Sequence, residues 1–108
     1  MDAQRLLREL ANSPDLVPFG ELVRPLVAQD LARRSDLVRT LRAYFAAGGN
    51  ASEAADRMFL HRNSMLYRLE RIQELTGLNL KDPGVALALQ LGLLTLEKGE
   101  EPDEVEHP

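Results

Sequence analysis

The chain has 108 residues, enough for one domain with a modest core, and 44% of them are hydrophobic whereas only 5% are aromatic. Its apolar residues are mostly leucine, alanine and valine, a mixture that favours helices packed on helices over a sheet. The absence of cysteine excludes disulfides and cysteine-bound metals, and the sequence shows neither a run long enough to cross a bilayer nor a signal peptide. We therefore expect a cytoplasmic, all-α protein without a cofactor or a membrane partner.

The net charge of −4 argues against a nucleic-acid partner until its distribution is considered. From Glu97 to Pro108 there are six acidic residues and one lysine, so the preceding 96 residues carry a net charge of +1. Residues 57–71 contain four arginines and one glutamate, a local charge of +3. Such a basic segment indicates either nucleic-acid binding or an ordinary solvated helix surface, and charge alone does not separate the two.

Apolar spacing predicts three helices in the first half of the chain, over about residues 2–12, 19–34 and 36–47. Pro25 lies inside the second of these segments, so that helix either starts late or kinks there. Ser35 is a suitable N-cap for the third helix, because its hydroxyl can accept a bond from a free amide in the first turn.

Three further helices are predicted over about residues 51–58, 62–76 and 83–98. Asn50 and Glu53 have the spacing of a capping box at the start of the first one. Gly77 closes the second, and Asp82 caps the third with Pro83 in its first turn. Five or six helices are therefore expected to form the bundle.

Residues 51–75 have the spacing of a helix-turn-helix, with three residues between the two helices. Ala55 is small enough to let the second helix approach, while Leu60 and Met65 would fill the angle between the helices. Phe59 stands where such turns often require positive φ, a conformation that strains a phenylalanine by about 1–3 kcal/mol. We favour the alternative that its ring packs into the core.

The face of the second helix opposite its apolar stripe carries hydrogen-bond donors. The residues on that face or in the first turn are His61, Arg62, Asn63, Ser64, Tyr67, Arg68 and Arg71. In a major groove arginine can bond to guanine and asparagine to adenine, and the positive end of the helix attracts phosphate. Each role has an alternative: His61 can be only a cap, Tyr67 can pack on a neighbouring helix, and Arg71 can pair with Glu74.

From Leu41 to Leu94 the sequence resembles the C-terminal helix-turn-helix of the PucR/CdaR family. The matching pieces are LRAYF before a GGN turn, HRN-S followed by YRLERI, ELTGLNL, and D-P with LALQL in the closing helix. Residues 20–40 resemble the helical lead-in found before this motif. The resemblance implies the output domain of a regulator of purine, sugar-diacid or related catabolic genes, with its effector-sensing part missing here. It implies DNA contacts by His61, Arg62, Asn63, Ser64, Tyr67 and Arg68.

These observations together predict three parts, which are a lead-in over 1–35, a helix-turn-helix domain over 36–98 and a disordered acidic tail over 99–108. The expected function is sequence-specific binding of double-stranded DNA as a homodimer, with the leucines of residues 83–96 supplying part of the dimer contact. A helical protein–protein adaptor is the alternative, favoured by the net acidity and the apolar last helix. An enzyme is not expected, because His61 and His107 are the only imidazoles and no nucleophile–base arrangement accompanies them.

Overall fold

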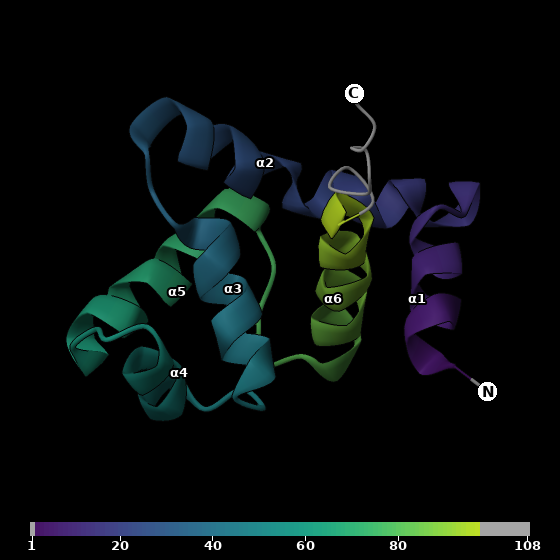
Figure 1. Ribbon diagram of the computed structural model, residues 1–108. Coiled ribbons are helices and arrows are strands. Elements are labelled where there is room, and N and C mark those ends of the chain that lie inside the picture. Colours follow the sequence, from purple (N-terminus) through teal and green to yellow (C-terminus); the bar gives the residue numbers. More distant parts are fainter. Residues whose placement is uncertain (1, 98–108) are drawn as a thin grey trace, which may run out of the picture.

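A computed structural model describes residues 2–97, and Figure 1 shows its helices. They are α1 (Ala3–Ala11), the 3₁₀ helix η1 (Pro14–Leu16), α2 (Val17–Arg33), α3 (Leu37–Ala46), α4 (Ala51–Arg57), α5 (Arg62–Thr76) and α6 (Pro83–Glu97). No strand occurs among residues 2–97, which confirms the predicted all-α fold. The tail over 99–108 lies outside the described residues.

Helix α2 joins the two halves of the molecule. It contacts α3 and α5 on one side and α6 on the other, and α1 packs against α6 at the far edge (Figure 1). The largest fully buried apolar side chains of the shared core are Val23, Leu26, Leu41, Met65, Ile72 and Leu89. The predicted lead-in thus contributes α2 to the same core as the helix-turn-helix, and the proposed boundary at residue 35 stays a prediction.

Two glycines allow α2 and α6 to cross closely. A Cβ at Gly92 would clash with the carbonyl oxygen of Phe19, and a Cβ at Gly20 would lie 2.8 Å from Oγ1 of Thr95. Backbone contacts backbone at this crossing, so no side chain larger than hydrogen fits at Gly92.

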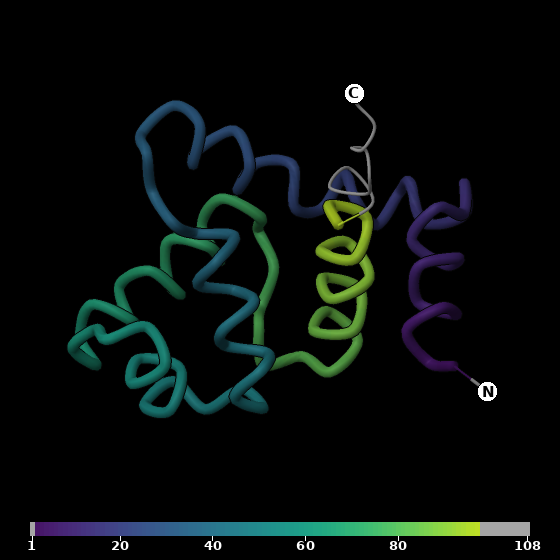
Figure 2. Tube along the Cα trace, in the orientation of Figure 1, coloured from purple at the N-terminus to yellow at the C-terminus, as the bar shows by residue number. Residues whose placement is uncertain are grey.

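Helix α2 begins at Val17, two residues before the predicted start, and continues through Pro25. Pro18 lies in its first turn, where the missing amide costs nothing. Proline in a helix interior removes one backbone bond and bends the axis. The trace of α2 changes direction part-way along its length (Figure 2), so the kink is the correct alternative rather than the late start.

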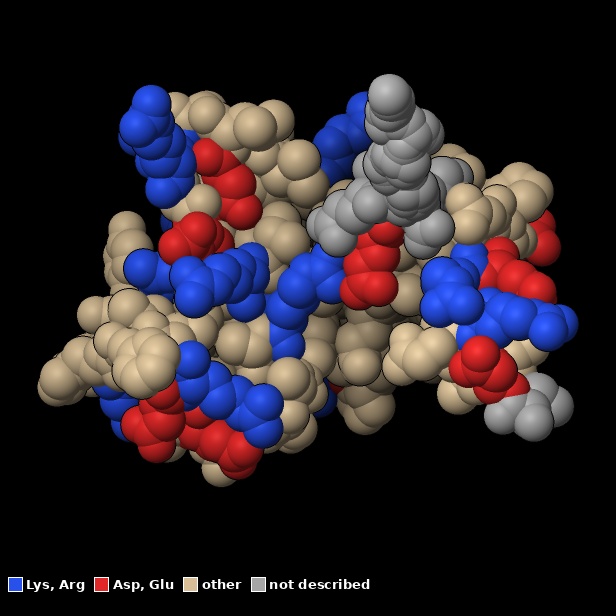
Figure 3. All heavy atoms as spheres, viewed as in Figure 1, with Lys and Arg blue, Asp and Glu red and all other residues tan. Residues whose placement is uncertain are grey.

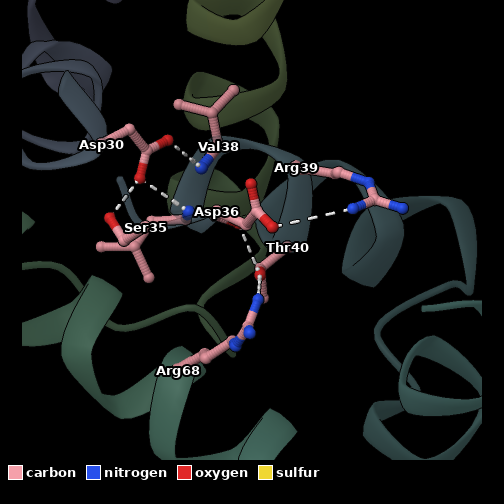
Figure 4. Close-up of polar contacts among 8 residues, drawn as sticks. Asp30, Ser35, Asp36, Val38, Arg39, Thr40 and Arg68 are labelled. Carbon is pink, nitrogen blue, oxygen red and sulfur yellow. Dashed lines mark hydrogen bonds and ion pairs between the residues drawn. The ribbon is translucent and has the colours of Figure 1, made fainter. Parts of the chain in front are cut away.

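The N-terminus of α3 is capped from α2, and this corrects the expectation that Ser35 caps it. The Asp30 carboxylate accepts bonds from the backbone amides of Leu37 at 2.8 Å and Val38 at 3.0 Å (Figure 4). Ser35 instead donates its hydroxyl to the same carboxylate at 2.6 Å. The N-cap residue itself, Asp36, makes no side-chain cap bond. A carboxylate seven residues upstream therefore satisfies amides that a local cap was expected to satisfy.

The predicted boundaries of the last three helices agree with the structure within a residue at each described end. Asn50 caps α4 by accepting from the amide of Glu53 at 2.9 Å, but the capping box is half-formed. Glu53 pairs with Arg57 at 3.0 Å instead of reaching back to Asn50, whose amide bonds to a backbone carbonyl. Asp82 caps α6 through the amide of Gly84 at 2.8 Å. None of the described helices is both long and apolar enough to cross a membrane.

Candidate nucleic-acid interface

Helices α4 and α5 form the predicted helix-turn-helix. Ala55 is 2% exposed and Met65 fully buried, so the first helix is small where the second one approaches. Leu60 is half-buried in the turn, and its amide donates to the carbonyl of Ala55 at 2.8 Å. The apolar stripe of α5 continues through Leu69 and Ile72, which are both buried. The helix is thereby fixed with its opposite face towards solvent.

Phe59 does not pack into the core, so the preferred sequence prediction was wrong. Its φ is +57° and its side chain is 95% exposed. The chain must reverse between α4 and α5, and Leu60 takes the inward position at this point. The left-handed conformation at Phe59 completes the turn and leaves its ring in solvent.

The start of α5 is held by side-chain contacts. His61 is the N-cap, and its Nδ1 accepts from the amide of Asn63 at 3.2 Å, so the capping role predicted as an alternative is present. Nε of Arg62 donates to Oγ of Ser52 at 2.9 Å and thereby ties α5 to the first turn of α4. Both His61 and Arg62 remain exposed.

The outward stripe of α5 is neutral and polar at its N-terminal end and acidic at its C-terminal end. Asn63 and Tyr67 are both exposed. The side chain of Tyr67 is 69% exposed, so the alternative that it packs on a neighbouring helix is wrong. Glu70 and Glu74 continue the same stripe. A negatively charged partner therefore meets the first two turns of α5 more favourably than the last two.

The two later arginines lie on the flank of α5 that faces the connection between α2 and α3. Arg68 is half-buried, and its Nη1 lies 3.3 Å from Oγ1 of Thr40 on α3 (Figure 4). Arg71 pairs with Glu74 at 3.2 Å, the alternative considered for it. Neither guanidinium stands at the centre of the exposed stripe.

Five of the seven predicted site residues share one surface groove of about 630 Å³ beside α5, namely Asn63, Ser64, Tyr67, Arg68 and Arg71. His61 and Arg62 lie at the start of the helix and do not line the groove. Its opposite wall is built by the α2–α3 connection, including Arg34 and Ser35. Arg34 was not among the site residues that the sequence predicted, although it borders the groove. The only sequence signal was the Arg33–Arg34 pair ahead of the motif.

Residues 37–95, more than half of the chain, match the family model described as the PucR C-terminal helix-turn-helix domain. The chain belongs to the PucR helix-turn-helix family. The resemblance seen in the sequence is therefore confirmed, and the matched region, which contains α4 and α5, is a helix-turn-helix domain of a DNA-binding regulatory family.

Among curated proteins, this PucR-type chain is 37% identical over 92 residues to the purine catabolism regulatory protein of Bacillus subtilis. This match covers 85% of the chain and 17% of that protein. It is 39% identical over 75 residues to the carbohydrate diacid regulator of Escherichia coli, covering 68% of the chain and 20% of the regulator. It is 32% identical over 73 residues to the proline-responsive transcriptional activator PutR of Bacillus subtilis, and this match covers 68% of the chain and 18% of the activator. The chain thus spans about a fifth of the length of these relatives. No solved structure matches it significantly.

The arginines of the PucR-type domain differ in whether an acid neutralises them. Arg39 and Arg57 each pair with a carboxylate on their own helix or its cap. Arg34, Arg62 and Arg68 have no acidic partner within ion-pair distance among the described residues. Basic side chains gather over the end of α2, α3, α4 and α5 in Figure 3, with acidic ones between them. Cationic side chains without an acidic partner therefore lie at the start of α5, where Arg62 is, and along the groove, where Arg34 and Arg68 are.

Proposed function

We propose that the chain binds double-stranded DNA sequence-specifically, as the output domain of a transcription regulator, with the N-terminal half of α5 in the major groove. The observation that carries this proposal is the exposed stripe of Asn63, Ser64 and Tyr67 near the positive N-terminal end of α5. The opposite face of this helix is buried in the core, so the stripe faces solvent. No acidic residue occurs in the first two turns of α5. The names of the relatives, two regulators and a transcriptional activator, support the same role.

The geometry favours different roles for the residues of this surface, with some contacting bases and others contacting phosphates. Asn63, Ser64 and Tyr67 point outwards at the centre of the contact face, so we assign them to base edges, with Asn63 suited to adenine. The cationic side chains border that face: Arg62 at the helix start, and Arg68 and Arg71 on the flank. We assign these arginines, together with His61, to phosphates, which fix the register of the helix on the duplex. His61, Arg62, Asn63, Ser64, Tyr67, Arg68 and Arg71 thus form one proposed DNA-binding surface.

We propose further that the intact regulator acts as a homodimer on two half-sites about one helical turn apart, because one recognition helix reads few base pairs. Most leucines of α6 pack within the chain, and Leu87 is the exception at 60% exposure. On α1, which packs on α6, Leu6 and Leu7 are 46% and 44% exposed. These three leucines, which lie on two neighbouring helices, are the apolar side chains that we propose for contact with a second copy. Sedimentation across a concentration series tests the proposal, and a strict monomer at high concentration would contradict a dimer contact within this chain.

The decisive experiment is selection of binding sites by the 108-residue chain from a pool of randomised duplexes. We expect enrichment of one motif. Asn63→Ala should then lower affinity for the selected duplex about 10- to 100-fold and relax the preference at one base pair. The same variant should bind a mixed-sequence duplex as the unaltered chain does. Asn12→Ala is the matched control, because Asn12 is an exposed asparagine that ends α1 at the far edge of the molecule. Absence of both enrichment and salt-dependent binding would overturn the proposal and favour the adaptor alternative.

A further inference from the structure

The α2–α3 connection faces the recognition helix across the groove described above. One wall carries Arg34 and Ser35, and the other carries Ser64, Tyr67, Arg68 and Arg71 from α5. The groove is therefore continuous with the proposed base-contacting surface, because Ser64 and Tyr67 belong to both. A ligand seated along α5 would meet the connection as well.

The connection is held rigidly in place. Asp30 binds the hydroxyl of Ser35 and two amides at the start of α3, so the chain between α2 and α3 is fixed at both ends (Figure 4). Arg34 adopts the left-handed conformation, with φ +54° and ψ +35°. Glycine or asparagine usually occupies such a position after a helix, since other side chains are strained there. An arginine at a strained position beside a candidate site points to a role for its side chain.

The donors in the groove suit a phosphodiester. Arg34 and Arg68 have no acidic partner within ion-pair distance among the described residues, whereas Arg71 forms an ion pair with Glu74. Asp36 also lines the groove, and Arg39 pairs with it at 3.7 Å. Ser35 donates its hydroxyl to Asp30, and Ser64 and Tyr67 are assigned to base edges, so the guanidinium groups are the donors left for a phosphate. Arginine is among the residues that contact nucleic-acid phosphates most often.

We propose that this groove receives the sugar-phosphate backbone of one DNA strand at the edge of the major groove occupied by α5, with Arg34 contacting a phosphate from the α2–α3 connection. The proposal rests on the proposed function. It makes the α2–α3 connection, which lies ahead of the helix-turn-helix, part of the DNA-binding surface. Arg34 contributes affinity and register but reads no base, so its effect is the same on every DNA sequence.

Arg34→Gly tests the contact without threatening the fold, because glycine accepts positive φ without strain. Against both the selected duplex and a mixed-sequence duplex, we expect affinity to fall about three- to tenfold at moderate salt. The slope of log affinity against log salt should fall by about one, the change expected for one lost phosphate contact. Arg34→Lys keeps the charge and should retain most of the affinity. Arg8→Ala removes the same charge from α1, at the far edge of the molecule, and should change neither quantity measurably.

Phosphate ethylation interference on the selected duplex locates the contact. The unaltered chain should be sensitive to ethylation of a phosphate that no longer matters to Arg34→Gly. If the chain binds DNA but Arg34→Gly behaves like Arg8→Ala in affinity, salt slope and interference, the groove proposal is wrong and the proposed function stands. If the unaltered chain binds neither duplex, both fail.

Discussion

Nη1 of Arg68 lies 3.3 Å from Oγ1 of Thr40, and this contact joins α5 to the first half of α3 (Figure 4). Thr40 is fully buried and donates the same hydroxyl to the carbonyl of Asp36 at 2.7 Å. The guanidinium is thus oriented by a buried group before any ligand arrives. An oriented donor loses less conformational entropy on binding than a free one.

The Arg68–Thr40 contact predicts a measurable coupling. Thr40→Val should lower the free energy of unfolding by about 1–2 kcal/mol, because the hydroxyl loses both its bond to the Asp36 carbonyl and its bond from Arg68. In a double-mutant cycle with Arg68→Ala, urea denaturation should give a coupling energy of about 0.5–1 kcal/mol. Strictly additive effects would show that the two side chains do not interact in solution. We also expect Arg68→Ala to weaken binding to all DNA sequences alike, as loss of a phosphate contact does.

The exposed Phe59 predicts a stabilising substitution. Phe59→Gly should raise the free energy of unfolding by up to about 1 kcal/mol, because the strain of positive φ is relieved and no core contact is lost. Phe59→Ala is the control: it removes the ring but keeps Cβ, so stability should stay nearly unchanged. Thermal melts of the two variants distinguish backbone strain from packing. A loss of about 3 kcal/mol or more in either variant would mean that the ring is buried in solution.

The cap that Asp30 supplies from α2 predicts a loss on its removal. Asp30→Ala should lower the free energy of unfolding by about 2 kcal/mol, because three hydrogen bonds to a carboxylate are lost and two amides of α3 are left without partners. Asp56→Ala removes an exposed acid from α4 and should change stability by less than about 0.5 kcal/mol. Urea denaturation of both variants is the measurement. Equal effects would rule out the cap as a source of stability.

The close crossing of α2 and α6 predicts opposite effects at two glycines of the same helix. Gly92→Ala should lower the free energy of unfolding by about 3 kcal/mol or prevent folding, because the new methyl group would meet the backbone of Phe19. Gly84→Ala lies in the first turn of α6, where the methyl group would meet a single Asp82 oxygen at 3.4 Å. It should stabilise the protein by about 0.5 kcal/mol, since alanine favours helix. Circular dichroism during heating compares them, and a tolerated Gly92→Ala would contradict the crossing.

The sequence by itself determined the all-α class, the last three helices and the helix-turn-helix. The ends of α4, α5 and α6 follow from caps at Asn50, His61 and Asp82 and from Gly77, each of which acts within one turn of its own position. The buried stripe of α5 follows from residue spacing alone, because a helix repeats its faces every three to four residues. These features depend on interactions so local that neighbouring residues in the chain are sufficient to specify them.

Only the tertiary structure decided which contacts surround the proposed DNA-binding surface. The cap of α3 comes from Asp30, seven residues upstream, and the partner of Arg68 is Thr40, 28 residues away. Arg34 borders the groove because α2 packs on both α3 and α5. Such pairs depend on how helices cross in space, and helix crossing is set by the shapes of buried side chains that no local pattern records.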